Sequence, residues 1–193
     1  MQPAEEAAAR PRVSVIIPNY NHARYLPQRI ESVLGQSVRE LEVILLDDCS
    51  PDASRQVIAQ YASQDARIRV VLNEQNSGST FKQWNKGFAL ARGEYVWVAE
   101  SDDFAEPDLL ARLLAPLVAD PAVSLAYCNS FDVDEQGTVS GTWEGFLTEL
   151  DPMWQHDFVV EGLPLVRRFL SFRNFIPNAS AVLMRASALR EAG

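Results

Sequence analysis

Three acidic side chains fall within the last four residues of Gly93–Asp103 (GEYVWVAESDD). The apolar residues Tyr95–Ala99 have the length and composition of a buried strand, and Glu100, Asp102 and Asp103 follow it directly. Carboxylates this close repel one another unless they share a cation. Oxygen ligands suit Mg²⁺ or Mn²⁺, which also take oxygens from a bound phosphate. The spacing therefore indicates a site that could hold a nucleotide diphosphate through a metal.

The same acids have a second interpretation. Asp102 or Asp103 could cap the helix expected to begin near Asp108, in a loop that is otherwise solvated. Clusters of charge are often only solvated surface. Taken alone, this segment leaves both interpretations open.

Short apolar segments alternate with helical ones along the chain, and these elements must position the acids. We expect strands at 12–18, 42–47, 68–72, 95–99, 123–129 and 180–184, and helices at 26–34, 52–62, 80–91, 109–118 and 163–172, with another beginning at Ser187. Pro116 is expected to end or kink its helix. This alternation predicts one α/β domain, a mostly parallel sheet flanked by helices.

The pattern is less regular after Ser130. Asp132–Gly141 is predicted to be a turn or small hairpin with Gln136-Gly137 at its tip. Thr142–Phe158 has no clear period, and two interpretations stay open for it: a mobile loop that covers a substrate, or an irregular packed segment.

Ligands of an open α/β sheet gather at the carboxyl ends of its strands. Those ends are Pro18–Asn21, Asp47-Asp48, Asn73–Ser77 and Glu100–Asp103. All four are polar, and two of them carry paired acids. Their convergence at one edge of the sheet predicts a binding site there.

The composition of the chain limits the kinds of ligand it could bind. The chain has 193 residues, a net charge of −9 and 47% apolar residues, which fits one domain and argues against binding to nucleic acid. Phosphates would therefore be held by a metal, by backbone N–H groups or by a few local cations. Cys49 and Cys128 show no metal-ligand or CxxC spacing, so we expect reduced thiols and a cytoplasmic location.

No apolar run approaches the roughly 20 residues needed to span a bilayer. Residues 1–11 lack the apolar core of a signal peptide and are expected to be a flexible leader or the end of a linker. Peripheral association with the inner face of a membrane, through a longer protein, remains open.

In order and spacing, these segments resemble the family 2 glycosyltransferases, which have the Rossmann-like GT-A fold. The matching segments are VSVIIPNYN (13–21), LPQRIESVLGQS (26–37), EVILLDDCSPDAS (42–54), NSG (76–78), NKGFALARGEY (85–95) and ESDD (100–103). More weakly, residues 176–193 look like the acceptor-side strand and helix of that family, where Asn178 and Ser180 lie. The resemblance implies a donor-binding core at 12–130 and an acceptor-side region at 131–193.

The resemblance also implies an activity: transfer of a sugar, with inversion, from a UDP- or dTDP-sugar to a hydroxyl of a saccharide or lipid-linked acceptor, in the synthesis of surface polysaccharide or glycan. Mn²⁺ or Mg²⁺ is the implied cofactor. A non-catalytic module that only binds nucleotide sugars is the alternative. Donor binding without transfer to any acceptor would distinguish it.

Site residues follow from the same resemblance. Pro18 and Tyr20 line the base pocket, and Asp48 accepts a hydrogen bond from the base imide or the ribose. The competing role for Asp47 and Asp48 is only to cap the helix near Asp52; we expect one of the two to cap it and Asp48 to bind. The other implied nucleotide contacts are Asn76, Lys82, Ser101 and Asp102. Asp102 also touches the metal, with Glu100 acting through water or from further away and Asp103 beside it.

Two departures from the family pattern matter. Trp84 stands where the family often carries Arg, which removes a cation near the phosphates and leaves that contact open; a place in the core is the other interpretation of Trp84. An inverting transfer also needs a general base, which the family usually places just after the segment that ends here at Gly193. We therefore expect the base beyond Gly193 and the chain to be part of a longer enzyme. The acids Asp151, Asp157 and Glu161 are expected to be solvated surface residues.

Other classes fit less well. A dehalogenase-type phosphotransferase places its acids after the first strand, where this chain has Pro18–Tyr20. A receiver domain needs a Lys after a late strand, where Asn129 and Ser130 stand instead. A dinucleotide-binding domain needs GxGxxG at the start of its first helix, and that motif is absent there.

Overall fold

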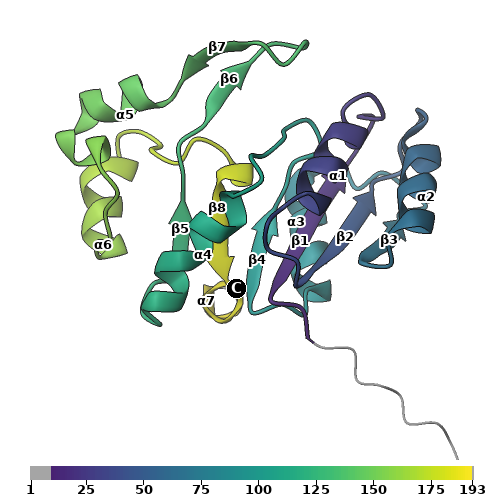
Figure 1. Ribbon diagram of the computed structural model, residues 1–193, viewed down its shortest axis with the longest axis horizontal. Coiled ribbons are helices and arrows are strands. Elements are labelled where there is room, and N and C mark those ends of the chain that lie inside the picture. Colours follow the sequence, from purple (N-terminus) through teal and green to yellow (C-terminus); the bar gives the residue numbers. More distant parts are fainter. Residues whose placement is uncertain (1–9, 193) are drawn as a thin grey trace, which may run out of the picture.

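A computed structural model describes residues 10–192, so most of the predicted leader and Gly193 lie outside the described residues. Its centre is a six-stranded sheet in the order β3-β2-β1-β4-β8-β5 (Figure 1). The strands are β1 (Val13–Asn19), β2 (Leu41–Asp47), β3 (Ile68–Leu72), β4 (Tyr95–Val98), β5 (Leu125–Tyr127) and β8 (Val182–Arg185). Strands β1 to β4 pair in parallel, which confirms the predicted mostly parallel α/β fold.

Helices cover both faces of this sheet. They are α1 (Leu26–Leu34), α2 (Ser54–Gln64) and α4 (Leu109–Ala119) on one face, and α3 (Thr80–Leu90) and α7 (Ala186–Ala192) on the other. Val15 of β1 shares a core cluster with Ile30 and Leu114, whereas the next residue, Ile16, shares the opposite cluster with Phe88. Because consecutive strand residues face opposite layers, an uninterrupted apolar run is what such a strand requires.

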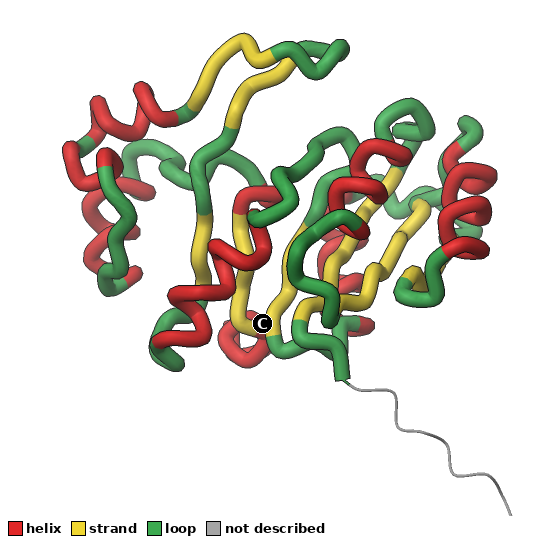
Figure 2. The backbone as a smooth tube through the Cα atoms, in the orientation of Figure 1, coloured by secondary structure: helices red, strands yellow, loops and turns green. Residues whose placement is uncertain are grey.

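Strand β8 departs from the parallel arrangement, since it runs antiparallel to both β4 and β5. The chain leaves β5 at the carboxyl edge of the sheet and passes through residues 131–178. It re-enters from the same edge (Figure 2). A strand that enters from that edge has to run in the opposite direction.

Residues 131–178 form an outer lobe beside the sheet (Figure 1). It contains β6 (Phe131–Val133), β7 (Val139–Thr142), α5 (Glu144–Leu150), a 3₁₀ helix (Pro152–Gln155), α6 (Gly162–Leu165) and a π-helical turn (Val166–Leu170), and a further 3₁₀ turn (Ala179–Ala181) follows. β6 and β7 confirm the predicted hairpin, whose Gly137 has the left-handed φ of 81°.

The outer lobe has its own small core of aromatic side chains. The ring of Trp154 lies 4.8 Å from that of Phe169, and its indole N–H donates to the hydroxyl of Tyr127 at 2.8 Å. Leu147 of α5 is buried in the same cluster. The segment Thr142–Phe158 is therefore packed, which is the second of its two interpretations.

Two helices differ in detail from the prediction. α4 continues through Pro116 and ends at Ala119. The helix expected at 163–172 begins as α6 and widens into a π turn, which the apolar pattern alone does not reveal. Among the described residues, no helix is long and apolar enough to span a membrane.

At the amino edge of the sheet, the buried carboxylate of Glu42 links β1, β2 and the loop that precedes β4. Glu42 of β2 accepts hydrogen bonds from the hydroxyl of Ser14 (2.6 Å) and from the backbone N–H and Nε of Arg92 (2.8 and 2.9 Å). Gly93 is needed beside it, because a Cβ there would lie 2.6 Å from the backbone N of Ser14. Burial raises the pKa of Glu42, but these hydrogen bonds outweigh burial and hold it below its ordinary value.

We predict that Glu42→Ala lowers the free energy of unfolding at pH 7 by about 1–3 kcal/mol, because the Ser14 and Arg92 donors lose their acceptor. Since the pKa of Glu42 is lowered in the folded state, its contribution is present above the unfolded-state pKa and is lost as pH falls through the folded one. Urea unfolding at several pH values measures this. Glu40→Ala, at an exposed position two residues away, is the control, and equal losses in the two variants would contradict the prediction.

Candidate functional site

The carboxyl ends of β1 and β2 are interlocked. Asn19 pairs with Asp47 in the sheet register, and its side-chain amide donates to Asp47 Oδ1 (3.0 Å) and to the hydroxyl of Ser50 (3.1 Å). The turns that follow these strands contain Asn21 and Cys49, both at the left-handed φ of 61°. Asn tolerates this conformation better than most residues, whereas Cys49 is unusual there. The backbone N–H of Asn21 donates to the hydroxyl of Ser50 at 3.0 Å, which holds the first turn against the second.

Asp48 lies beneath the loop that follows β3, and both of its oxygens are engaged. Oδ1 accepts from the side-chain amides of Asn73 (2.6 Å) and Gln83 (2.9 Å), and both oxygens accept from the backbone N–H of Ser77 (2.9 and 3.1 Å). The hydroxyl of Ser77 donates to Oδ2 at 2.8 Å. Asp48 is only 4% exposed, so it anchors the loop to the sheet.

The expectation that Asp47 or Asp48 caps the helix near Asp52 is wrong, because neither side chain caps helix α2. The backbone N–H of Ser54 donates instead to Asp52 at 2.9 Å. Asp47 is fully buried and forms an ion pair with Arg55 (3.0 Å).

Glu100 lies just after β4, and its side chain accepts a hydrogen bond from Trp84. Its Oε1 accepts the indole N–H of Trp84 at 2.7 Å, which gives Trp84 a polar role in place of the expected cation. Burial raises the pKa of Glu100 to about 7, and the negative charges of Asp102 and Asp103 act in the same direction. The hydrogen bond from Trp84 opposes this rise.

Arg29 of α1 lies fully buried beneath the acids. Its Nε donates to the backbone carbonyl of Glu100 (2.7 Å) and its Nη2 to the hydroxyl of Ser180 (3.0 Å), while Nη2 lies 3.7 Å from Asp103 Oδ2. Ser180 in turn accepts the backbone N–H of Glu100 at 3.0 Å. Burial lowers the pKa of Arg29 to about 10, and the nearby carboxylates oppose this fall. The backbone carbonyl and the backbone N–H of Glu100 are thus both held by buried side chains, those of Arg29 and Ser180.

Arg29 is not among the predicted site residues, although the sequence contains a signal for it. The buried positions of α1 are Leu26, Arg29, Ile30 and Val33, so the Arg occupies the apolar face of the helix. A charged residue on such a face has to find a partner inside the protein. His22 is not among the predicted site residues either. Its Nδ1 lies 2.7 Å from the hydroxyl of Ser101, and it follows a strand end already marked as polar.

Among the three acids, Asp102 is the exposed one, whereas Asp103 is half-buried toward Arg29. Within residues 10–192 no group of three His, Cys, Asp or Glu side chains is arranged to hold a metal. Two of the three acids have other partners, since Glu100 accepts from Trp84 and Asp103 lies near Arg29. The donor chemistry still suits Mg²⁺ or Mn²⁺, which can be held by one or two carboxylates when phosphate oxygens complete the shell.

The remaining predicted nucleotide contacts lie around the same edge. Tyr20 is 48% exposed, and Pro18 is buried within β1. Asn76 donates to the backbone carbonyl of Asp48 at 3.0 Å. Lys82, in the first turn of α3, donates one N–H to the carbonyl of Ser77 at 3.0 Å and is otherwise exposed.

The predicted acceptor-side residues, Asn178 and Ser180, make structural hydrogen bonds where the chain re-enters the sheet before β8. Asn178 caps the 3₁₀ turn by accepting the backbone N–H of Ala181 at 2.9 Å, and its amide lies 3.3 Å from the hydroxyl of Ser130. Ser180 is buried with its hydroxyl between Arg29 and Glu100. The structure therefore brings Ser180 to the acids from below, not to the open side.

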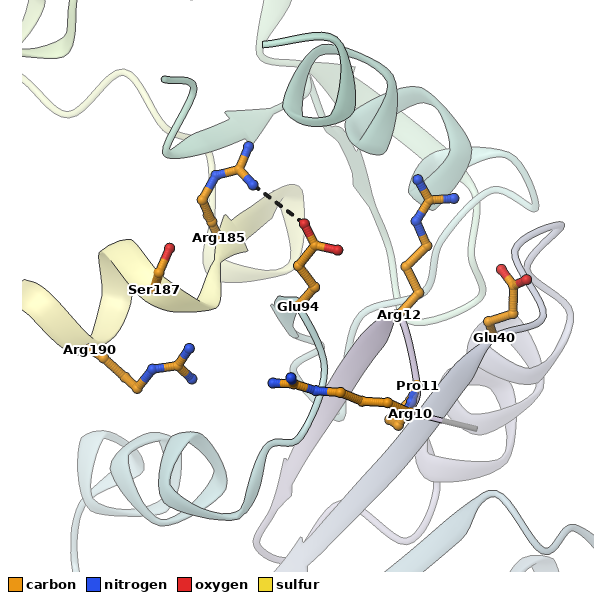
Figure 3. Close-up of a pocket in the computed structure, with 8 residues that line it drawn as sticks. All are labelled: Arg10, Pro11, Arg12, Glu40, Glu94, Arg185, Ser187 and Arg190. Atoms are coloured by element: carbon orange, nitrogen blue, oxygen red, sulfur yellow. Dashed lines mark ion pairs between the residues drawn. The ribbon is translucent and has the colours of Figure 1, made fainter. Parts of the chain in front are cut away.

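A hollow of about 670 Å³ lies at the opposite edge of the sheet, where the parallel strands begin (Figure 3). Its lining residues are Arg10, Pro11, Arg12, Glu40, Glu94, Arg185, Ser187 and Arg190. The position of Arg12 just before β1 and of Glu94 just before β4 places this hollow away from the carboxyl-edge acids. It contains none of the predicted site residues.

Curated relatives match parts of the chain. It is 31% identical over 153 residues to the glycosyltransferase GlyG of Streptococcus pneumoniae, across 79% of this chain and 47% of GlyG. It is 31% identical over 129 residues to chondroitin synthase of Escherichia coli, across 67% of this chain and 18% of that protein. The chain thus spans less than half the length of these two relatives.

Solved structures share the fold. Staphylococcus aureus TarS 1–349 in complex with UDP superposes with a TM-score of 0.68 at 22% identity, over 94% of this chain and 48% of that one. The mannosyltransferase PcManGT of Pyrobaculum calidifontis, in complex with GDP-Man and Mn²⁺, gives a TM-score of 0.56 at 27% identity, over 62% of this chain and 35% of that one. The family model of glycosyl transferase family 2 matches residues 14–176. This chain belongs to glycosyl transferase family 2.

Proposed function

We propose that the carboxyl edge of the sheet binds a UDP- or dTDP-sugar, and that the longer protein transfers its sugar, with inversion, to a saccharide or lipid-linked acceptor during the synthesis of polysaccharide or glycan. The observation that carries this proposal is Asp102, an exposed carboxylate that follows the central strand β4. Glu100, two residues before it, has both its backbone N–H and its backbone carbonyl held by hydrogen bonds. Family membership and the UDP named with TarS support a nucleotide-sugar donor. The matched chondroitin synthase supports a polysaccharide context.

We propose Mn²⁺ or Mg²⁺ as the cofactor, with Asp102 as its protein ligand, Asp103 beside it and Glu100 further away. When bound, the cation would neutralise the negative charge of the departing diphosphate. The first turn of α3 offers backbone N–H groups at the same edge, and Lys82 keeps two N–H donors available for phosphate oxygens. The Mn²⁺ named with PcManGT supports this choice.

We propose that Pro18 and Tyr20 border the base, with Ser101 and Asn76 shaping the pocket. The exposed ring of Tyr20 can stack on a nucleobase. For Asp48 we propose a hydrogen bond from the base imide. Because both Asp48 oxygens are already engaged by the protein, the base would have to share an acceptor with Ser77 or Asn73.

The proposed inversion requires a general base that faces the acceptor hydroxyl. Asp151 is engaged by Arg168 (2.5 Å) and by the backbone N–H of Met153 (2.9 Å), which makes it a poor candidate. Since the chain spans less than half of GlyG, we propose that another part of the longer protein supplies the base.

We also propose that the reaction takes place in the cytoplasm. Cys49 and Cys128 are both free thiols, which suits a reducing compartment. The two side chains lie on different elements, and each makes a weak contact with a backbone carbonyl.

The metal proposal predicts that Mn²⁺ strengthens UDP binding and that Asp102→Asn removes this gain. Loss of a charged ligand is expected to weaken UDP binding in the presence of Mn²⁺ by about tenfold or more. Calorimetric titration of UDP with and without Mn²⁺ measures the effect. Asp157→Asn, at an exposed position in the outer lobe, is the matched control. Equal UDP affinity with and without Mn²⁺ in the wild-type chain would refute the metal role.

The Asp48 proposal separates into two measurable parts. Asp48→Asn places an amide where only acceptors fit, so we predict a loss of about 1.5–3 kcal/mol in the free energy of unfolding. If Asp48 also reads the base, the folded variant should lose the preference for UDP over ADP. Unfolding by urea and calorimetric titration of both nucleotides measure the two effects. A destabilised variant that keeps the wild-type UDP preference would show that Asp48 is only an anchor.

A further inference from the structure

The hollow at the amino edge of the sheet, lined by the eight residues named above, carries a concentration of positive charge (Figure 3). We call it the amino-edge hollow. Its lining contains four Arg and two Glu, which gives a net charge of +2, whereas the whole chain has a net charge of −9. Its volume of about 670 Å³ lies within the range of small-molecule sites, roughly 300–1,000 Å³. Charge and volume together suit an anionic small molecule.

One wall of the amino-edge hollow is held in place by hydrogen bonds. The side chain of Arg185, at the end of β8, is 15% exposed, and its guanidinium donates to the backbone carbonyls of Val123 (3.1 Å) and Leu117 (2.5 Å). Glu94 forms an ion pair with it at 3.6 Å. The backbone N–H of Ala186 donates to the carbonyl of Glu94 at 2.9 Å, so the beginning of α7 is held against the segment before β4.

The segment before β1 forms a second wall. The backbone N–H of Arg12 donates to the carbonyl of Glu40 at 2.7 Å, and the Nε of Arg10 donates to the carbonyl of Arg92, also at 2.7 Å. In Figure 3 the guanidinium groups of Arg10 and of Arg190, which comes from α7, point toward one another across the hollow. Like charges that face each other repel, and an anion between them replaces this repulsion with attraction.

The carboxylates of the lining do not neutralise these two arginines. In the part of the chain that the structure describes, Glu94 pairs with Arg185, and no ion pair joins a carboxylate to Arg10 or Arg190. The Nε of Arg10 is bonded to a backbone carbonyl, so its terminal N–H groups are the donors that face the hollow. Ser187, which is exposed in the same lining, adds a hydroxyl.

We propose that the amino-edge hollow binds a phosphate group between the guanidinium groups of Arg10 and Arg190, with the hydroxyl of Ser187 as a further donor. A phosphate group carries a charge of about −1.5 to −2 at pH 7 and presents oxygens in several directions, so it can accept from two guanidinium groups at once. A carboxylate has a single charge and two oxygens in one plane, which match one guanidinium.

The proposed phosphate site is separate from the proposed donor site. Glu94, in the lining of the hollow, lies just before β4, whereas Asp102 follows the other end of that strand. The proposal therefore goes beyond the transfer reaction and does not depend on donor binding.

An NMR titration of the isotope-labelled 193-residue chain with inorganic phosphate tests the proposal. The ionic strength is held constant with NaCl, and no divalent metal is added. We expect saturable shifts of the backbone amide signals of Glu94, Ser187 and Arg190, and no such shifts with chloride alone. Arg10→Gln combined with Arg190→Gln should weaken phosphate binding by about tenfold or more, because both guanidinium groups are lost.

Glycerol phosphate in place of inorganic phosphate distinguishes two sources of the bound group. Tighter binding of the ester would support the proposal and assign the hollow to a phosphorylated small molecule. Equal or weaker binding of the ester would also support it and assign the hollow to free phosphate.

The matched control is Arg69→Gln combined with Arg167→Gln, which removes two exposed Arg side chains outside the hollow. This control should bind phosphate like the wild type, and thermal unfolding of each variant checks that it is folded. The proposal is overturned if phosphate shifts the signals no more than chloride does, or if the control loses as much affinity as the double variant of the hollow. Shifts confined to Ser77 and Lys82, at the carboxyl edge, would also overturn it.

Discussion

The buried guanidinium of Arg29 is the interaction on which the arrangement of the candidate site depends. It joins α1, the end of β4 and the chain's return to β8 through three contacts: the carbonyl of Glu100, the hydroxyl of Ser180 and the charge of Asp103. An isolated charge in a protein interior is strongly unfavourable, so Arg29 is stable only while these acceptors surround it. The same contacts fix the backbone of Glu100 and leave Asp102 facing outward.

The two edges of the sheet use polar groups in different ways. At the amino edge, both oxygens of the Glu42 carboxylate are bonded to groups of the chain itself, Ser14 and Arg92. At the carboxyl edge, Asp48 and Asp47 hold the loops, which leaves Asp102, Tyr20 and Lys82 accessible above them. Polar groups that anchor loops and polar groups available to a ligand are thus neighbours in the sequence but separate in the structure.

Much of the fold could be predicted from the sequence because β1 to β4 and their helices have strong periodic patterns. The direction of β8 could not, since it depends on which edge the outer lobe returns to, and no local pattern records that. The convergence of four polar strand ends was also predictable. The exposure of Asp102 beside a partly buried Glu100 was not predictable, because the partners of Glu100, Trp84 and Arg29, come from other parts of the sequence. Trp84 replaces an Arg that is common in the family, and its indole N–H donates a hydrogen bond to Glu100.

The central claim is that the fixed end of β4 presents Asp102 to a metal-bound nucleotide diphosphate. Anomalous diffraction at the manganese edge, from crystals of this chain grown with UDP and Mn²⁺, tests it most directly. We expect one strong peak within bonding distance of an Asp102 oxygen and of the diphosphate, with Glu100 still hydrogen-bonded to Trp84. UDP bound at this edge without a manganese peak, or a peak away from Asp102, would contradict the account.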